Sequence, residues 1–237
     1  MTKKAVSVNP FAFYGLPTLL YGTLLPAPDT VKGLEHVLRR VLDEGHELGV
    51  HGYDHVEWHD RLFQKGERFM KEQLEKATES YRRVARSSPD GFAAPGWQMT
   101  GECSTELKKL GYTYSSSTRG ATPFIPECGD EPGIAEIPTT LPTLDELTLV
   151  VGSDQKKILA YFGDRLRSDA LNVHTIHAEL EGSSAVDLLM GIIGLLKERG
   201  ARYTRLKDAC AVSGALKKGS IAQRSIEGRP GTVACQI

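Results

Sequence analysis

Short apolar segments alternate with amphipathic helical segments along most of this chain, and this alternation constrains the fold more than any other feature. Apolar residues recur at helical spacing in segments 31–44, 64–86, 154–167 and 185–198. Strand-like apolar runs fill residues 47–50, 92–94, 112–116, 134–137, 171–177 and 202–204. Strands that alternate with helices form a parallel sheet or a barrel, so we predict an α/β fold.

The composition fits one soluble α/β domain with a sizeable core. The chain has 237 residues, 40% of them hydrophobic, and a formal net charge of −1. A net charge this close to zero argues against nucleic acid as a partner. The cysteines are widely spread without a C-x-x-C pair, which favours reduced thiols, and they are Cys103, Cys128, Cys210 and Cys235. We find neither a long apolar span nor a signal-peptide pattern in the sequence.

Two histidines directly follow the apolar run 47–50. His51 and His55 are four residues apart, so on one turn of backbone their side chains point the same way. Neutral imidazole is the commonest metal ligand of this type, which makes the pair a candidate zinc half-site. His59 lies eight residues beyond His51, about 12 Å along a helix axis, and is too far away to share the same metal. Asp54 would face elsewhere on a helical turn and is a poor replacement ligand.

A second histidine pair closes the segment 171–177. His177 stands at its end, where we expect a separate proton donor, and His174 falls on the opposite strand face and is expected to pack. In parallel α/β folds, functional sites lie at the carboxyl ends of the strands. The residues expected at that edge are His51, Pro95, Ser117 and His177.

Several motifs resemble those of the polysaccharide deacetylases, the NodB-like hydrolases. Residues 45–51 together with His55 are similar to the histidine metal motif of that family. The resemblance is greatest to its 4-deoxy-4-formamido-L-arabinose-phosphoundecaprenol deformylases. The motifs that carry it are residues 13–15, 93–97, 119–124, 137–143, 175–182 and 235–236.

The resemblance implies a distorted (β/α)7 barrel and one divalent metal ion, with zinc the first candidate. It makes His51 and His55 metal ligands and His177 the residue that protonates the leaving amine. The implied reaction removes formate from an N-formyl amino sugar carried on undecaprenyl phosphate, a step of lipid A modification. Such an enzyme would be cytoplasmic and peripheral to the inner membrane, with the membrane surface and the lipid-linked sugar as its partners.

The sequence also departs from the family pattern. The family opens with a strand that carries two Asp residues, a metal ligand and the general base, whereas no Asp or Glu precedes Asp29 here. We therefore expect a barrel incomplete at the first strand, with an unpaired sheet edge and weak zinc binding. Ser117 stands where the deformylases have Asp, and Gln98 where Arg is common. The alternatives are a truncated, non-catalytic relative and a deacetylase acting on another N-acyl sugar.

Three residues are assigned to substrate binding. Arg119 suits a phosphate group, and the alternative is a salt bridge that anchors a loop. Glu179 could bind sugar hydroxyls or the new amine, or simply be an exposed acid, and Trp97 is placed beside them.

The sequence divides into three parts. Residues 1–30 form an apolar N-terminal segment, 31–215 the barrel and 216–237 an irregular tail packed on it. Residues 11–28 carry no charge, and they either cover the core or contact a bilayer or polyprenyl chain.

Overall fold

The computed structural model describes residues 20, 24–25, 28–129, 131–212 and 214–237. Most of the apolar segment 1–30 lies outside the described residues, and with it the predicted lipid contact. The helices are α2 (Thr30–Gly33), α3 (Glu35–Asp43), α4 (His55–Ala85), α5 (Gly101–Lys109), α6 (Leu144–Val151), α7 (Gln155–Asp164), α8 (Ala178–Glu181), α9 (Val186–Glu198) and α10 (Leu206–Val212), with a 3₁₀ turn at Pro95–Trp97. The strands are β1 (Gly91–Phe92), β2 (Tyr114–Ser115), β3 (Phe124–Cys128), β4 (Glu131–Pro132), β5 (Ala135–Glu136), β6 (Lys217–Gly219), β7 (Ile221–Arg224) and β8 (Val233–Gln236).

The strands form a mixed sheet in the order β1-β2-β5-β3-β4, with β6 paired to β3, and a separate hairpin of β7 and β8. β1, β2 and β5 run parallel, whereas β3 runs antiparallel to β5. Val50 extends the parallel part through a bridge to Phe92. The predicted α/β class is therefore confirmed. Among the described residues no strand pairs with the other side of Val50 and no closed barrel forms.

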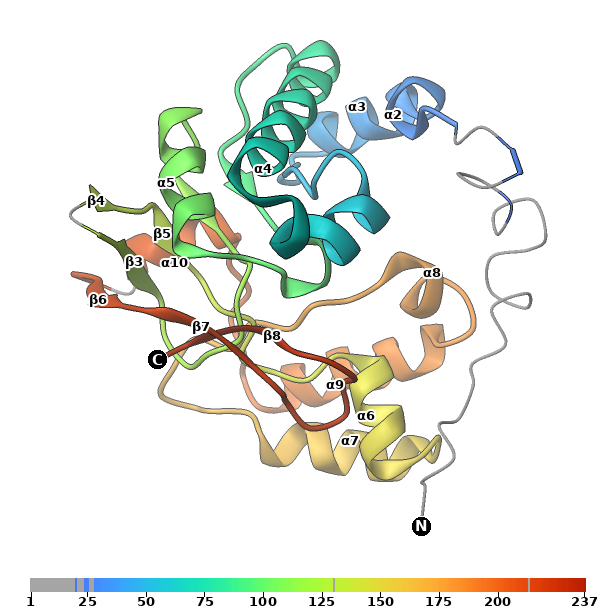
Figure 1. Ribbon diagram of the computed structural model, residues 1–237. Coiled ribbons are helices and arrows are strands. Elements are labelled where there is room, and N and C mark those ends of the chain that lie inside the picture. Colours follow the sequence, from blue (N-terminus) through green and yellow to red (C-terminus); the bar gives the residue numbers. More distant parts are fainter. Residues whose placement is uncertain (1–19, 21–23, 26–27, 130, 213) are drawn as a thin grey trace.

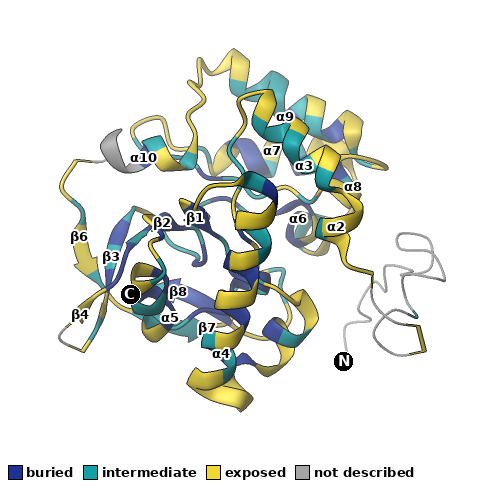
Figure 2. Cartoon of the chain, turned by 90° about the horizontal axis from the view of Figure 1, so that it is seen from above, coloured by how far each residue is buried: buried dark blue, intermediate teal, exposed yellow. Residues whose placement is uncertain are grey.

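Helices lie on both sides of these strands (Figure 1). One core joins α4 and α5 to the sheet through Trp58, Leu74, Phe92 and Leu107. A second core holds α6, α7 and α9 together and includes Leu147, Ile158, Phe162 and Ile192. Buried residues are concentrated on the strands and on the inner helix faces, while α2 and much of α4 face solvent (Figure 2). The helices α4 and α5 therefore share one apolar core with the sheet, and the helices α6, α7 and α9 share another.

Helix α4 begins earlier than predicted. It starts at His55 rather than at residue 64, because the Asp54 carboxylate accepts a hydrogen bond from the Glu57 N–H at 2.9 Å and caps the first turn. Gly66, at φ +71°, kinks the helix and separates this first part from the long amphipathic part that the sequence predicted. The early start places His55 in the first turn, next to His51.

Three predicted strands do not form as strands in the described part of the chain. Of residues 47–50, only Val50 pairs, through its single bridge to Phe92. Residues 171–177 are extended, but among the described residues their backbone contacts to a neighbouring extended segment are those of Val173 with Thr140 and Leu141, so no ladder forms. Residues 202–204 likewise pair with no neighbour in that part.

The Thr100 side chain caps helix α5, and the buried Ser104 hydroxyl within this helix accepts the Ile134 N–H. The tail is more regular than predicted. β7 and β8 pair over four residues, and β8 hydrogen-bonds to the backbone of Arg119 through Ala234 and Gln236. Val233, Ala234 and Cys235 are buried in succession, and the glycine content of the tail concealed this strand in the sequence.

Candidate metal and proton-transfer site

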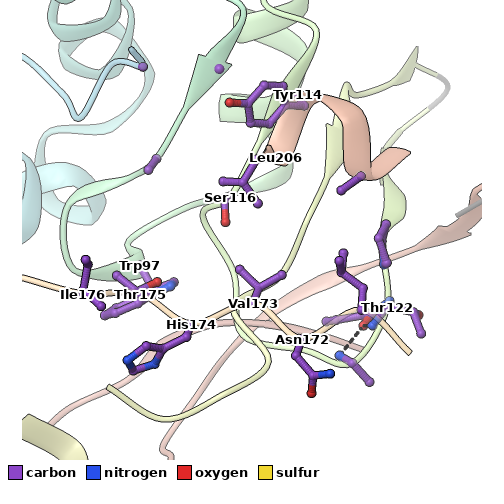
Figure 3. A pocket seen from close by; sticks show the side chains of 18 of the residues that line it. Trp97, Tyr114, Ser116, Thr122, Asn172, Val173, His174, Thr175, Ile176 and Leu206 are labelled. Atoms are coloured by element: carbon purple, nitrogen blue, oxygen red, sulfur yellow. Dashed lines mark hydrogen bonds between the residues drawn. The ribbon is translucent and has the colours of Figure 1, made fainter. Parts of the chain in front are cut away.

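The carboxyl ends of the parallel strands open into one cavity of about 2340 Å³. Figure 3 shows the extended wall of residues 172–176, with Trp97 and Ser116 on the facing segments. His51, His55, Trp97, His177 and Glu179 all line this cavity. The structure thus brings five of the six predicted site residues to a common space.

The imidazole rings of His51 and His55 lie 5.2 Å apart, measured between their centroids. Gly52 makes this approach possible. It has φ +77°, which favours glycine, and a Cβ there would come within 3.0 Å of the Pro95 ring. The chain can therefore leave the sheet after His51 and enter α4 at His55 within a few residues.

Hydrogen bonding defines the tautomer of His51. Its Nδ1 lies 2.8 Å from the Ala93 carbonyl oxygen, and a carbonyl can only accept. Nδ1 therefore carries the proton, and Nε2 keeps a free lone pair. Loss of water around the concave site lowers the pKa of His51, although the Ala93 carbonyl works in the opposite direction. The same burial, with repulsion from His51 next, lowers the pKa of His55 to about 4.

Both rings are consequently neutral near pH 7, which is the form that binds a metal ion. Two neutral imidazoles fit one side of a zinc site, where three protein ligands are usual. The described residues contain no group of three His, Cys, Asp or Glu side chains that could hold a metal ion. The pair fits the metal in chemistry, and these residues supply only part of the ligand set.

His177 is held from two directions at the start of α8. Its backbone N–H donates to one oxygen of the buried Glu181 carboxylate at 2.9 Å, and the other oxygen of that carboxylate has no hydrogen-bond partner in the described structure. Its Nδ1 lies 3.9 Å from Asp145 Oδ1, an ion-pair distance too long for a hydrogen bond. Asp145 also lines the cavity and was missed in the sequence, although it stands just beyond the motif 137–143.

Arg119 does not line the cavity. Its guanidinium donates to Glu146 at 3.0 Å and to the Leu141 carbonyl at 3.1 Å, so the structure contains the loop-anchoring salt bridge that was the alternative interpretation. A phosphate contact by Arg119 stays a prediction. Arg229 does line the cavity, and its guanidinium lies 4.7 Å from the centre of the Trp97 ring.

Other candidate residues have structural partners. Ser117 is fully buried, and its hydroxyl accepts the Ala94 N–H at 2.9 Å. The Gln98 side chain donates to the Thr232 carbonyl at 2.8 Å and so fastens the tail. Neither residue faces the cavity.

The remaining histidines differ from the metal pair. His59 lines the cavity and contacts its neighbour Asp60 at 2.7 Å. His174 packs edge-on against Phe162, with 4.9 Å between ring centroids, and its side chain points away from Ser116 (Figure 3). Neither ring nitrogen of His174 makes a hydrogen bond of ordinary geometry in the described structure. Burial lowers its pKa to about 4, although the nearby Pro142 backbone works in the opposite direction.

Comparison with known proteins agrees with this geometry. The family profile described as polysaccharide deacetylase matches residues 21–115, which contain the histidine pair. A protein of Shewanella sediminis (strain HAW-EB3), named a probable 4-deoxy-4-formamido-L-arabinose-phosphoundecaprenol deformylase, is 31% identical over 201 residues. This chain therefore resembles the polysaccharide deacetylases over the part that carries the histidine pair. The predicted resemblance is confirmed.

The extent of the match differs between relatives. The alignment covers 85% of this chain and 65% of the Shewanella protein, so the chain spans less than two thirds of that relative's length. A protein of Wigglesworthia glossinidia brevipalpis with the same name is 27% identical over 237 residues. That alignment covers 98% of this chain and 82% of the Wigglesworthia protein.

Solved structures share the fold. A probable polysaccharide deacetylase from Pseudomonas aeruginosa PAO1 superposes with a TM-score of 0.53 at 19% identity. The superposition covers 76% of this chain and 63% of the Pseudomonas chain. The Puue allantoinase has a TM-score of 0.55 at 19% identity, with the same coverage. Helices long and apolar enough to cross a membrane were searched for in the described residues, and none was found.

Proposed function

We propose that this protein is an amide hydrolase that removes the formyl group from 4-deoxy-4-formamido-L-arabinose carried on undecaprenyl phosphate, in lipid A modification. The observation that carries this proposal is the meeting of the neutral pair His51 and His55 with His177 on one cavity. The names of the two deformylase relatives supply the substrate.

His51 Nε2 and the His55 ring would hold a divalent metal, with zinc as the first candidate. Such a metal, when bound, polarises an amide carbonyl and lowers the pKa of a water molecule. His177 acts on the opposite end of the amide. Hydrolysis adds water across the C–N bond, so the nitrogen must gain a proton as formate leaves, and His177 donates it. Glu181 and Asp145 place the imidazole for this transfer, through the backbone and through charge.

The cavity mouth suits a substrate with an apolar anchor. Val56 and Ile176 line the cavity yet are 66% and 50% exposed. Exposed apolar side chains around a polar site fit contact with a polyprenyl chain at a membrane surface. Glu179 is available for sugar hydroxyls. A phosphate contact would fall to Arg229, which lines the cavity, and to the predicted Arg119, although both guanidinium groups also pair with Glu146.

One observation favours a second candidate function. In it, the protein is a relative of these enzymes that folds and binds metal weakly but has no catalytic activity. That observation is the lack, within the described residues, of a third metal donor next to the histidine pair. A deacetylase of another N-acyl sugar is the remaining alternative.

Formate release from the N-formyl sugar lipid separates these candidates. The assay uses this chain and any longer form read in frame upstream of Met1, with the N-acetyl sugar lipid as a matched substrate. Metal-dependent release of formate but not acetate supports the deformylase. Acetate release indicates the other deacetylase. No release from either form, with the protein folded, supports the non-catalytic candidate.

A further inference from the structure

We propose that Glu136 is a positioning residue that fixes the orientation and tautomer of His51 through Ser117 and the backbone of Ala93 and Ala94. The proposal rests on the proposed function only in treating His51 as a site residue. The arrangement itself is a property of the free protein.

Glu136 is a buried acid that neither the motifs nor the proposed chemistry uses. It lies on β5 with no exposed surface, and in the described part of the chain no basic side chain forms an ion pair with it. Burial raises the pKa of this carboxyl group. A buried carboxylate without a cation is costly unless hydrogen bonds satisfy it, so such a group calls for an explanation.

The hydrogen bonds to Glu136 come from one short segment, residues 115–118, at the end of β2. One carboxylate oxygen accepts the N–H groups of Ser117 and Thr118 at 2.7 and 2.8 Å and the Thr118 hydroxyl at 2.9 Å. The other accepts the Ser115 hydroxyl. These donors fix the path of the backbone where β2 ends, and with it the place of the Ser117 hydroxyl.

Ser117 in turn fixes the backbone of the neighbouring segment, just after β1. Its hydroxyl oxygen accepts the Ala94 N–H at 2.9 Å, inside the core. The adjacent carbonyl, that of Ala93, is the group that accepts Nδ1–H of His51 at 2.8 Å. Each step joins residues far apart in sequence: Glu136 to Ser117, Ser117 to Ala94, and Ala93 to His51. The Ala93 carbonyl is thus held at a set position, and it holds His51 with Nε2 directed away from the strand.

A purely structural role for Glu136 would stabilise the fold without setting the His51 tautomer. The two roles are separable because a buried serine elsewhere has the same chemistry. Ser104 is fully buried, and its hydroxyl accepts the Ile134 N–H at 3.1 Å, outside this series of contacts. Ser104→Ala is therefore a matched control for Ser117→Ala.

The test is the ring ¹⁵N spectrum of the whole chain labelled at histidine, recorded without metal at about pH 8, where an ordinary imidazole is neutral. His51→Gln assigns the His51 signals. We expect His51 in the wild type and in Ser104→Ala to be almost entirely protonated on Nδ1. In Ser117→Ala and Glu136→Gln, the ratio of the two tautomers should move toward Nε2–H by roughly fivefold to tenfold, the worth of one ordinary hydrogen bond.

An unchanged His51 tautomer in Ser117→Ala, with the far-ultraviolet circular dichroism of the wild type, overturns the proposal. An equal shift in Ser104→Ala does the same, since it would mark general loosening. If Glu136→Gln does not fold, the comparison of the two serine variants decides. Absence of deformylase activity does not affect the result, because the spectrum reports on the free protein.

Discussion

The two histidine regions of the site are held in different ways. The His51 ring donates at 2.8 Å to the Ala93 carbonyl just after β1, and the N–H of the same peptide, that of Ala94, donates to the buried Ser117 hydroxyl. His177 ends an extended segment that forms no strand, and its ring is 3.9 Å from its nearest carboxylate. The His51 ring is therefore fixed by a hydrogen bond of its own, whereas His177 is held through its backbone and its ring has only a longer contact through charge.

The largest expected effect is on the donor side. In whichever form of the protein releases formate, His177→Ala should lower turnover by about 10²- to 10⁴-fold, the usual worth of a general acid. Metal content should stay at the wild-type level, because His177 is not proposed as a ligand. Steady-state formate release and elemental analysis measure the two quantities, with His36→Ala on α3 as the control. Turnover that survives the change would place the proton donor elsewhere.

Buried His174 gives the next largest effect, on stability. Its pKa is about 4 when folded and about 6.5 when unfolded, so between these values the unfolded chain binds more protons. The contribution to stability is complete above pH 6.5 and is lost as the pH falls toward 4, by an amount on the order of 3 kcal/mol.

His174→Leu should flatten this acid-side slope in urea unfolding measured from pH 7 to pH 4. Exposed His36, changed to Gln, should leave the slope unchanged. A slope equal to that of the wild type in His174→Leu would show that the ring is hydrated in solution.

Zinc binding sharpens the comparison from the ligand side. We expect the chain as it stands to bind Zn²⁺ weakly and His51→Ala to weaken that binding at least about tenfold, since a lost ligand should cost no less than a lost supporting contact. Isothermal titration measures this, and His59→Ala is the control because His59 is engaged by Asp60. Tight stoichiometric zinc in a chain that lacks both His51 and His55 would mean that the ligands lie elsewhere.

The smallest effect is expected from Asp145→Asn. At 3.9 Å the Asp145 carboxylate acts on His177 through charge and not through a hydrogen bond, so turnover should fall by no more than about tenfold. Loss of activity as complete as in His177→Ala would show that the two groups close together when substrate binds, and that the donor side is as tightly organised as the ligand side.

The sequence alone determined the features that depend on local spacing. The apolar run before His51, the four-residue step to His55 and the amphipathic helices could be predicted because neighbours in sequence set them. The resemblance to the polysaccharide deacetylases followed from the same local motifs. By contrast, 42 residues separate His51 from the Ala93 carbonyl that sets its tautomer.

Only the tertiary structure decided which polar groups meet. Asp145 beside His177, Arg119 buried against Glu146 and Glu136 beneath Ser117 are contacts between segments that are distant in sequence. Residues 171–177 have the apolar pattern of a strand, yet strand formation also needs a partner in register, which no local pattern supplies. The tail formed β7 and β8 for the opposite reason. Its weak local signal was overridden by pairing with Arg119 and by burial of Val233 and Ala234, since a chain folds to satisfy its backbone hydrogen bonds wherever a neighbour provides them.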